Sequence, residues 1–212
     1  MNTTTNTQII LKSRPNGMPT DENFEIIKST IPEVRHGEVL IKVIWLSLDP
    51  YMRGRMSDAK SYAQPVGIGE VITGGAVGKI IRSNTSKFNE GDFVEGFTIG
   101  WQEYAVIDAS LIRKVDPELA PIQTAVGVLG MPGITAFFGL FHVCKPVPGD
   151  HVVVSAASGA VGQIVGQLAK IAGCTVIGIA GGKKKCDYIT EKINFDYSID
   201  YKNENVFNKI KE

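Results

Sequence analysis

The sequence predicts an α/β protein in two parts: a barrel-like β domain over residues 1–120 and the beginning of a doubly wound parallel sheet over residues 121–212. Two observations predict this division. Short β-like runs separated by turn residues fill the first part, and this spacing is typical of a compact β domain. Beyond Pro121, strands alternate with helical patterns, which is the βαβ signature of a parallel sheet.

The β-like runs of the first part differ in how clearly they predict strands. Residues 39–48 form the clearest apolar run. Residues 70–81 mix apolar side chains with three glycines, which is typical of a bent or bulged strand. A turn at residues 89–92 precedes the remaining predicted strands, which cover residues 93–97, 101–107 and 111–115.

The second part opens with two predicted helices, over residues 122–129 and 133–142, and Pro132 suits the first turn of the second one. The β-branched run at residues 151–155 is a strand of the type buried in parallel sheets. Apolar residues at helical spacing then mark one face of a helix: Val161, Ile164, Val165, Leu168 and Ala172. Two more strands are predicted over residues 175–180 and 197–199, with a helix over residues 184–192 between them.

The charge balance and the cysteines exclude several classes of function. Lys plus Arg and Asp plus Glu both total 22, so no excess of positive charge indicates nucleic acid or a membrane surface as a partner. No apolar run reaches the roughly 18 residues of a membrane span. The three cysteines are widely spaced and match neither a disulfide framework nor a zinc motif. We therefore expect no metal and a reducing compartment, the cytoplasm.

A turn of small residues joins the strand at 151–155 to the following helix. Ala157, Gly159 and Gly162 occupy the three positions where a dinucleotide-binding turn needs small residues, with alanine in place of the first glycine. The helix that follows presents free N–H groups and a partial positive charge to phosphates. Any tight connection can use glycine, but the position inside a βαβ unit predicts a dinucleotide site.

The end of the second parallel strand distinguishes NAD(H) from NADP(H). An NAD site places Asp or Glu there, about 20 residues after the turn, to bind the ribose hydroxyls. This sequence has Ala180-Gly181-Gly182 followed by Lys183, Lys184 and Lys185. Any one of these lysines is more simply a solvated residue at a helix start. Cationic charge is unfavourable at that end of a helix, however, so a compensating anion is expected. The pattern predicts NADP(H).

Three motifs in this order resemble the zinc-free medium-chain dehydrogenases/reductases: Asp49–Arg53, Leu129–Ala136 and Val154–Gln163. The chain is most similar to the prostaglandin reductase / leukotriene B4 12-hydroxydehydrogenase group, which includes alkenal double-bond reductases and curcumin reductases. The match covers essentially the whole chain. The resemblance implies a GroES-like domain in front of a Rossmann domain. It also implies NADPH-dependent reduction of the C=C bond of α,β-unsaturated ketones or aldehydes.

The resemblance also implies roles for single residues, although it assigns no certain catalytic residue to this chain. Tyr51 would face the substrate, while Met131 and Thr135 would lie near the nicotinamide. The remaining cofactor positions are Gly159, Ala160, Val161 and Gly162 for the pyrophosphate, Lys185 for the 2′-phosphate and Tyr201 for the adenosine end. Each has a structural alternative: Tyr51 as a half-buried aromatic after a strand end, Met131 as core filler and Tyr201 as a ring on the sheet edge.

The chain departs from that group at its end. A doubly wound domain has two βαβαβ halves with the cofactor across the switch between them, and this chain ends at Glu212, just after the third predicted strand. We therefore expect a truncated form, weakly stable and inactive by itself, whose full-length form is a homodimer acting on a small enone or enal. The alternatives are a quinone reductase of the same superfamily and a non-catalytic nucleotide-binding remnant.

Overall fold

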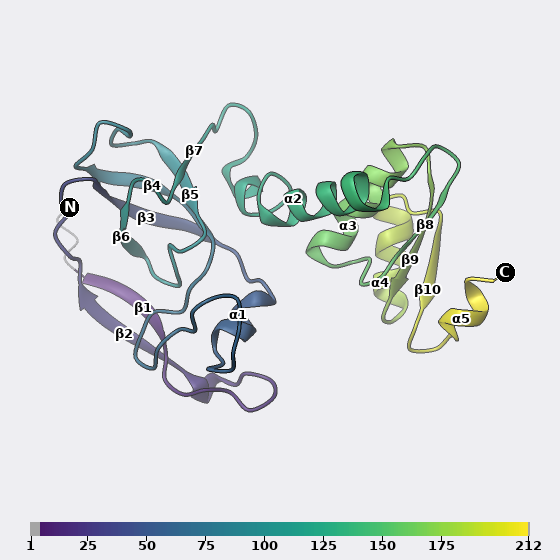
Figure 1. Ribbon diagram of the computed structural model, residues 1–212, viewed down its shortest axis with the longest axis horizontal. Coiled ribbons are helices and arrows are strands. Elements are labelled where there is room, and N and C mark those ends of the chain that lie inside the picture. The colour runs from purple at the N-terminus through teal and green to yellow at the C-terminus, as the bar shows by residue number, and fades with distance from the viewer. Residues whose placement is uncertain (1–4, 212) are drawn as a thin grey trace. The chain divides into compact units, whose positions relative to one another are not determined.

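The computed structural model describes residues 5–211, and the chain divides into two compact units, Met1–Val126 and Gly127–Glu212. Figure 1 shows strands β1–β7 in the first unit and β8–β10 in the second. The division falls after the short 3₁₀ helix η2 (Ile122–Val126), where the sequence predicted a longer helix and a boundary after residue 120. Ala125 of η2 is buried against Val77 and Val115, so η2 packs within the first unit.

The first unit is built on a five-stranded antiparallel sheet of order β6-β3-β4-β5-β7. Its strands are β3 (Glu38–Leu46), β4 (Ala76–Ser83), β5 (Phe93–Gly96), β6 (Tyr104–Asp108) and β7 (Arg113–Val115). The pairing of β3 with β4 shifts register twice, as expected for the glycine-rich strand. A side chain on Gly78 would collide with the carbonyl oxygen of Lys42. Glycine therefore allows the two backbones to approach closely.

An antiparallel strand pair, β1 (Thr5–Leu11) and β2 (Phe24–Thr30), was not predicted from the sequence; the short 3₁₀ helix η1 (Asp21–Asn23) precedes β2. The buried side chain of Asn6 joins β1 to β6. Its Nδ2 donates to the carbonyl oxygen of Tyr104 (2.7 Å), and the Tyr104 N–H donates to Asn6 Oδ1 (2.9 Å). The side-chain amide thus satisfies the backbone groups of a residue 98 positions away.

Tyr51 is half-buried, as its structural alternative expected, but it begins a helix that the sequence did not predict. Helix α1 (Tyr51–Arg55) follows Pro50, whose φ of −56° is already helical. Proline fixes φ in the helical range and needs no N–H acceptor, so it suits the beginning of a helix. Met52 of α1 is buried in a small core with Leu11 and Ile72.

The second unit contains a three-stranded parallel sheet of order β10-β9-β8. Its strands are β8 (His151–Val154), β9 (Thr175–Ala180) and β10 (Tyr197–Asp200). Its helices are α2 (Met131–Phe137) with its π-helical continuation η3 (Phe138–Cys144), α3 (Ala160–Ile171), α4 (Lys183–Asp187) with its π-helical continuation η4 (Tyr188–Lys192), and α5 (Val206–Lys209). The predicted strand–helix–strand order is confirmed, and α5 is an addition to it. No helix within residues 5–211 has the length and hydropathy that a membrane crossing requires.

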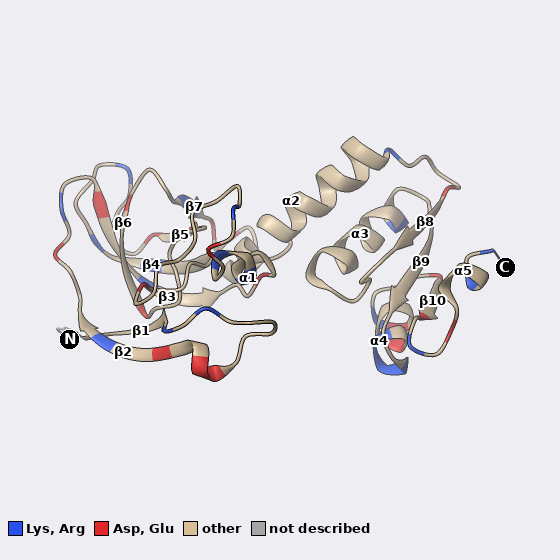
Figure 2. Cartoon of the chain, turned by 60° about the horizontal axis from the view of Figure 1, so that its bottom comes forward, with Lys and Arg blue, Asp and Glu red and all other residues tan. Residues whose placement is uncertain are grey.

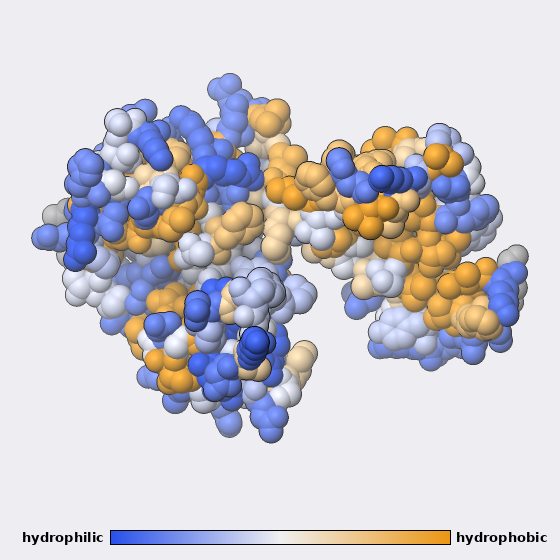
Figure 3. All heavy atoms as spheres, in the orientation of Figure 1, coloured by the Kyte–Doolittle hydropathy of each residue, from blue (hydrophilic) through white to orange (hydrophobic). Residues whose placement is uncertain are grey.

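One face of the parallel sheet is covered and the other is partly open. Val176, Gly178 and Ala180 are buried on the covered face. Val153 and Tyr197 are 41% and 62% exposed, so β8 is not a fully buried strand as the sequence predicted. Figure 3 shows hydrophobic residues gathered on the visible surface of the second unit.

The buried face of α3 differs from the predicted one. Gly162, Gly166 and Ala169 are its buried residues, whereas the larger apolar side chains Val165 and Leu168 border the core. Small residues occupy the face because α3 packs close to the layer beneath it. Apolar periodicity found the helix, but it did not identify the residues of closest contact.

Candidate nucleotide-binding site

The turn between β8 and α3 is built around the carbonyl oxygen of Ala156. This oxygen accepts a hydrogen bond from the Gly159 N–H at 2.8 Å. A Cβ on Gly162 would lie 2.5 Å from the same oxygen, and one on Gly159 would lie 3.0 Å from it. Ala156 itself has a φ of +46°, a left-handed conformation that is uncommon for alanine. The turn is therefore tight, and a side chain at Gly162 would force its backbone to move.

The first turn of α3 has donors available for a ligand. Gly159 is the N-cap, and its carbonyl oxygen accepts the first intrahelical bond, from Gln163. The N–H groups of Ala160, Val161 and Gly162 consequently have no acceptor within the helix. The first turn also carries no acidic residue. These N–H groups and the helix dipole suit a pyrophosphate.

The carboxyl ends of β9 and β10 bring together residues that the sequence separates. The ring of Tyr201 lies over Gly181, where a Cβ would be 2.7 Å from Tyr201 Oη. The Tyr201 N–H donates to the carbonyl oxygen of Ala180 (3.2 Å). Asp200 accepts a hydrogen bond from the Gly182 N–H through Oδ1 (2.7 Å). The Gly181-Gly182 turn is thus held by two consecutive residues of the neighbouring strand end.

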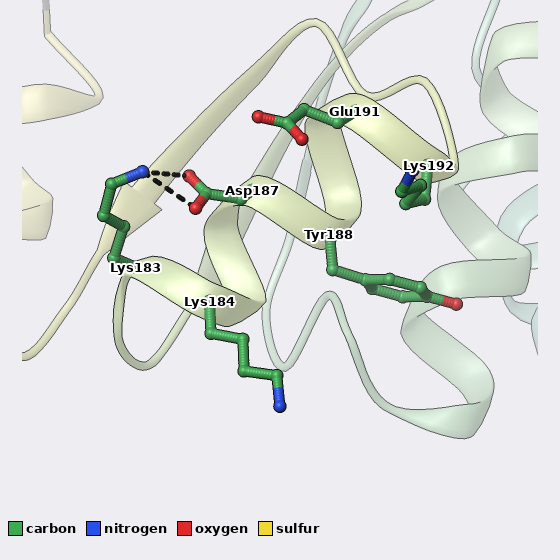
Figure 4. A pocket seen from close by; sticks show the side chains of 6 residues that line it. All are labelled: Lys183, Lys184, Asp187, Tyr188, Glu191 and Lys192. Atoms are coloured by element: carbon green, nitrogen blue, oxygen red, sulfur yellow. Dashed lines mark hydrogen bonds and ion pairs between the residues drawn. The ribbon is translucent and has the colours of Figure 1, made fainter.

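The three lysines of α4 are not equivalent. Figure 2 shows that α4 carries both basic and acidic residues. Lys183 forms an ion pair with Asp187 at 2.8 Å, shown by the dashed lines in Figure 4. The hydrogen bond to Asp187 raises the pKa of Lys183. Within residues 5–211, neither Lys184 nor Lys185 forms an ion pair, so their charges are not neutralised within the unit.

A shallow groove runs along the outer side of α4 and η4. Figure 4 shows Lys184, Tyr188 and Lys192 among its lining side chains. The Tyr188 hydroxyl donates to Gln163 Oε1 at 2.9 Å, and this bond joins η4 to the first turn of α3. The tyrosine therefore links the helix that carries the lysines to the helix that follows the Ala156–Gly159 turn.

Met131 and Thr135 lie one turn apart on α2, which begins at Met131. Met131 is half-buried and Thr135 is exposed. Residues four apart on a helix lie on the same side, so the structure brings these two side chains together. Their contact with a nicotinamide remains a prediction.

Tyr51 stands in the first unit among charged and phenolic groups. Burial, and next the carboxylate of Asp49, raise the pKa of the Tyr51 phenol. A hydrogen bond from the Gly75 backbone, and next the charge of Arg55, act in the opposite direction. Asp49 accepts a hydrogen bond from Ser47 Oγ at 2.6 Å. Arg55 Nε is buried and has no hydrogen-bond partner within the described part of the chain. Sequence reasoning missed Arg55, although a helix prediction at Tyr51 would have placed it one turn away.

No group of three or more His, Cys, Asp or Glu side chains is arranged to hold a metal ion among residues 5–211. The three cysteines are free thiols, with Cys144 exposed and Cys174 and Cys186 buried. Burial raises the pKa of the Cys186 thiol.

Comparisons with known proteins agree with this arrangement. Residues 7–115 match a family model described as the N-terminal domain of oxidoreductase. The chain is 43% identical to the NADPH-dependent curcumin reductase of Escherichia coli over 92% of its length, which is 56% of that protein. It is 44% identical to the 2-alkenal reductase (NADP(+)-dependent) of Nicotiana tabacum, over 94% of this chain and 59% of that one.

Among solved structures, the chain resembles CurA from Vibrio vulnificus in complex with NADPH. The TM-score is 0.90 and the identity 48%, over 96% of this chain and 60% of the other. The chain thus spans somewhat more than half the length of these relatives. The α/β class with a GroES-like unit and a Rossmann-type unit is confirmed. The chain belongs to the medium-chain dehydrogenase/reductase group of prostaglandin, curcumin and 2-alkenal reductases.

Proposed function

We propose that this protein is an NADP(H)-dependent oxidoreductase that reduces the C=C bond of α,β-unsaturated ketones and aldehydes. The observation that carries the proposal is the glycine-lined turn before α3, because the N–H groups of residues 160–162 have no acceptor within the helix and suit a pyrophosphate. The cofactors in the names of the Escherichia coli and Nicotiana tabacum relatives support NADP(H), as does the CurA structure with NADPH.

The residues present fit the cofactor. Gly159 and Gly162 leave room against Ala156 where a side chain would not fit, so a phosphate can approach the backbone. Lys185 would meet the 2′-phosphate, and the exposed ring of Tyr201 would border the adenosine. Met131 and Thr135 would lie at the nicotinamide. When bound, NADPH supplies the hydride, and the protein supplies orientation and hydrogen-bond donors.

Tyr51 is the residue of the first unit that we propose to face the substrate. A phenol with the ordinary tyrosine pKa of about 10 is protonated at neutral pH, and burial raises the pKa of Tyr51 further, so its hydroxyl can donate a hydrogen bond. Negative charge develops on the carbonyl oxygen of an enone during reduction, and a fixed donor stabilises it. We assign no proton donor for the α-carbon.

The remaining expectations from the sequence stay proposals. The resemblance to this group supports a homodimer. The three free cysteines agree with a reducing compartment, which we propose to be the cytoplasm. The balanced charge of 22 basic and 22 acidic residues supports a small-molecule substrate over nucleic acid as the partner.

The test measures NADPH oxidation with a simple enone. It uses this chain, its Tyr51→Phe variant, and an extended form of each that carries the remaining C-terminal segment of the Escherichia coli relative. We expect the extended form to turn over the enone and the extended Tyr51→Phe variant to be about tenfold slower, since one hydrogen bond to developing charge is lost. The expectation that the 212-residue chain alone is inactive is tested in the same assay.

Two results would overturn the proposal. Binding of NADPH without enone turnover in either form would show that the substrate class is wrong, and quinones would be the next substrates to test. Failure of both forms to bind NADPH would remove the cofactor assignment itself.

A further inference from the structure

We propose that Asp200 is a positioning residue that makes the second unit selective for nucleotides with a 2′-phosphate. The inference rests on the proposed NADP(H) function and extends it to a residue that would act through the Gly181-Gly182 turn. Asp200 ends β10, and its carboxylate accepts three hydrogen bonds. Oδ1 accepts from the N–H groups of Gly182 (2.7 Å) and Lys202 (3.1 Å), and Oδ2 accepts from Asn203 Nδ2 (2.7 Å).

The bond to Gly182 fixes the turn that leads into α4. Gly182 is the N-cap of α4 and has a φ of +92°, a conformation that favours glycine. Its carbonyl oxygen accepts the N–H of Lys185 at 3.0 Å. Asp200 therefore fixes Gly182, and Gly182 in turn begins the first turn of the helix that carries Lys185.

The residue next to Asp200 covers the other glycine of the same turn. Tyr201 follows Asp200 directly, and its ring covers Gly181, where any side chain would collide with it. The Gly181-Gly182 turn thus lies between two groups proposed to meet the adenosine end: the Tyr201 ring packs over Gly181, and Asp200 holds Gly182, whose carbonyl oxygen accepts the Lys185 N–H. Without the carboxylate, the Gly182 N–H would lose its acceptor and the turn would be free to move.

The donors around Asp200 also explain how an acidic residue can lie near a phosphate site. In an NAD site, the acid at the end of the second strand keeps its oxygens free for the ribose hydroxyls. Here the acid is on the third strand, and the N–H groups of Gly182 and Lys202 and the Asn203 amide engage both of its oxygens. These donors lower the pKa of Asp200 and offset its negative charge locally.

The experiment is equilibrium binding of 2′,5′-ADP and 5′-AMP to the 212-residue chain. These fragments differ only in the 2′-phosphate and need no catalysis. We expect Asp200→Ala to weaken 2′,5′-ADP binding about tenfold, because a tenfold loss corresponds to about one hydrogen bond to a charged group. The binding of 5′-AMP should weaken less than about threefold. Asp200→Asn keeps an acceptor for the Gly182 N–H, so it should restore most of the affinity.

Asp187→Asn is the matched control, because it removes one negative charge from the helix that carries Lys185 without touching the Gly181-Gly182 turn. We expect it to leave the preference for 2′,5′-ADP unchanged or slightly increased. If Asp200→Ala does not fold, Asp200→Glu takes its place, since it keeps the charge but displaces the oxygens, and the same selective loss is expected.

Equal weakening of both fragments would show that Asp200 supports only the fold and would overturn the inference. Tighter 2′,5′-ADP binding by Asp200→Ala than by the wild-type chain would also overturn it, by showing net repulsion. Wild-type binding without preference for 2′,5′-ADP would instead contradict the proposed NADP(H) function, so the two failures are distinguishable.

Discussion

The ring of Phe195 fills the space that a side chain on Gly166 would need. Gly166 is a buried residue of α3, and Phe195 is 3% exposed in the core of the second unit. The separation between α3 and the layer beneath it is therefore set by a glycine facing an aromatic ring. The turn proposed to bind the pyrophosphate leads into the same helix, so this contact also positions the proposed site.

Gly166→Ala should destabilise the second unit by about 2 kcal/mol, because the added methyl group overpacks a filled core. Gly139→Ala is the control: no atom lies within 4 Å of a Cβ there, so a small gain of about 0.5 kcal/mol is expected. Urea unfolding followed by circular dichroism measures both. Both tryptophans, Trp45 and Trp101, lie in the first unit, so their fluorescence reports that unit separately. Similar effects of the two substitutions would refute the packing argument.

Gly162→Ala should weaken NADPH binding more than about tenfold while leaving most of the fold intact. Its Cβ would lie 2.5 Å from the Ala156 carbonyl oxygen, so the turn and its N–H groups must shift. Fluorescence titration with NADPH measures the affinity, and Gly139→Ala again serves as the control. Unchanged affinity in a folded Gly162→Ala variant would show that the pyrophosphate lies elsewhere.

Asn6→Leu should destabilise the first unit by about 3 kcal/mol. The substitution leaves the backbone N–H and C=O of half-buried Tyr104 without their side-chain partners and removes a polar group that is itself buried. Asn16→Leu provides a comparison at an exposed position, where little change is expected. Tryptophan fluorescence during urea unfolding reports the free energy of the first unit. A loss below about 1 kcal/mol would mean that water replaces the amide at little cost.

The second unit should lose stability in acid through Asp196. The Lys170 ammonium, and next the N–H of buried Val176, lower the pKa of this carboxyl below its ordinary value. Because the folded pKa lies below the unfolded one, the stabilisation is present above about pH 4 and is lost as the pH falls through the folded value. Urea unfolding of Asp196→Asn should therefore show a weaker dependence on pH below about pH 4. If the free energy of unfolding of Asp196→Asn falls with pH as steeply as that of the wild type, other carboxyls cause the acid sensitivity.

Local patterns predicted much of the second unit. The small-residue turn at Gly159–Gly162 and the strand at residues 175–180 were found where the structure has them, because their periodicity and turn chemistry are local. The predicted buried face of α3 was wrong, because the small residues Gly162, Gly166 and Ala169 are buried and the larger apolar side chains border the core. Hydrophobicity ranks Ile164 above Gly166, whereas close packing against Phe195 requires the smaller residue.

Contacts between distant residues could not be predicted. The pair β1–β2 was missed because polar residues such as Asn6 interrupt the strand pattern, and the partner of Asn6 is 98 positions away. The bond from Gly182 to Asp200 depends on the register of two parallel strands in the same way. The Lys183–Asp187 pair, by contrast, has helical spacing and could have been predicted from the sequence.

The central claim is that the second unit binds NADP(H) through its 2′-phosphate, and a direct titration of this chain with NADPH and NADH tests it. We predict that NADPH binds at least about tenfold more tightly. Lys185→Gln should remove most of this preference, and Lys183→Gln should not, because Lys183 is already paired with Asp187. Equal affinity for the two cofactors, or the same preference in Lys185→Gln, would contradict the account.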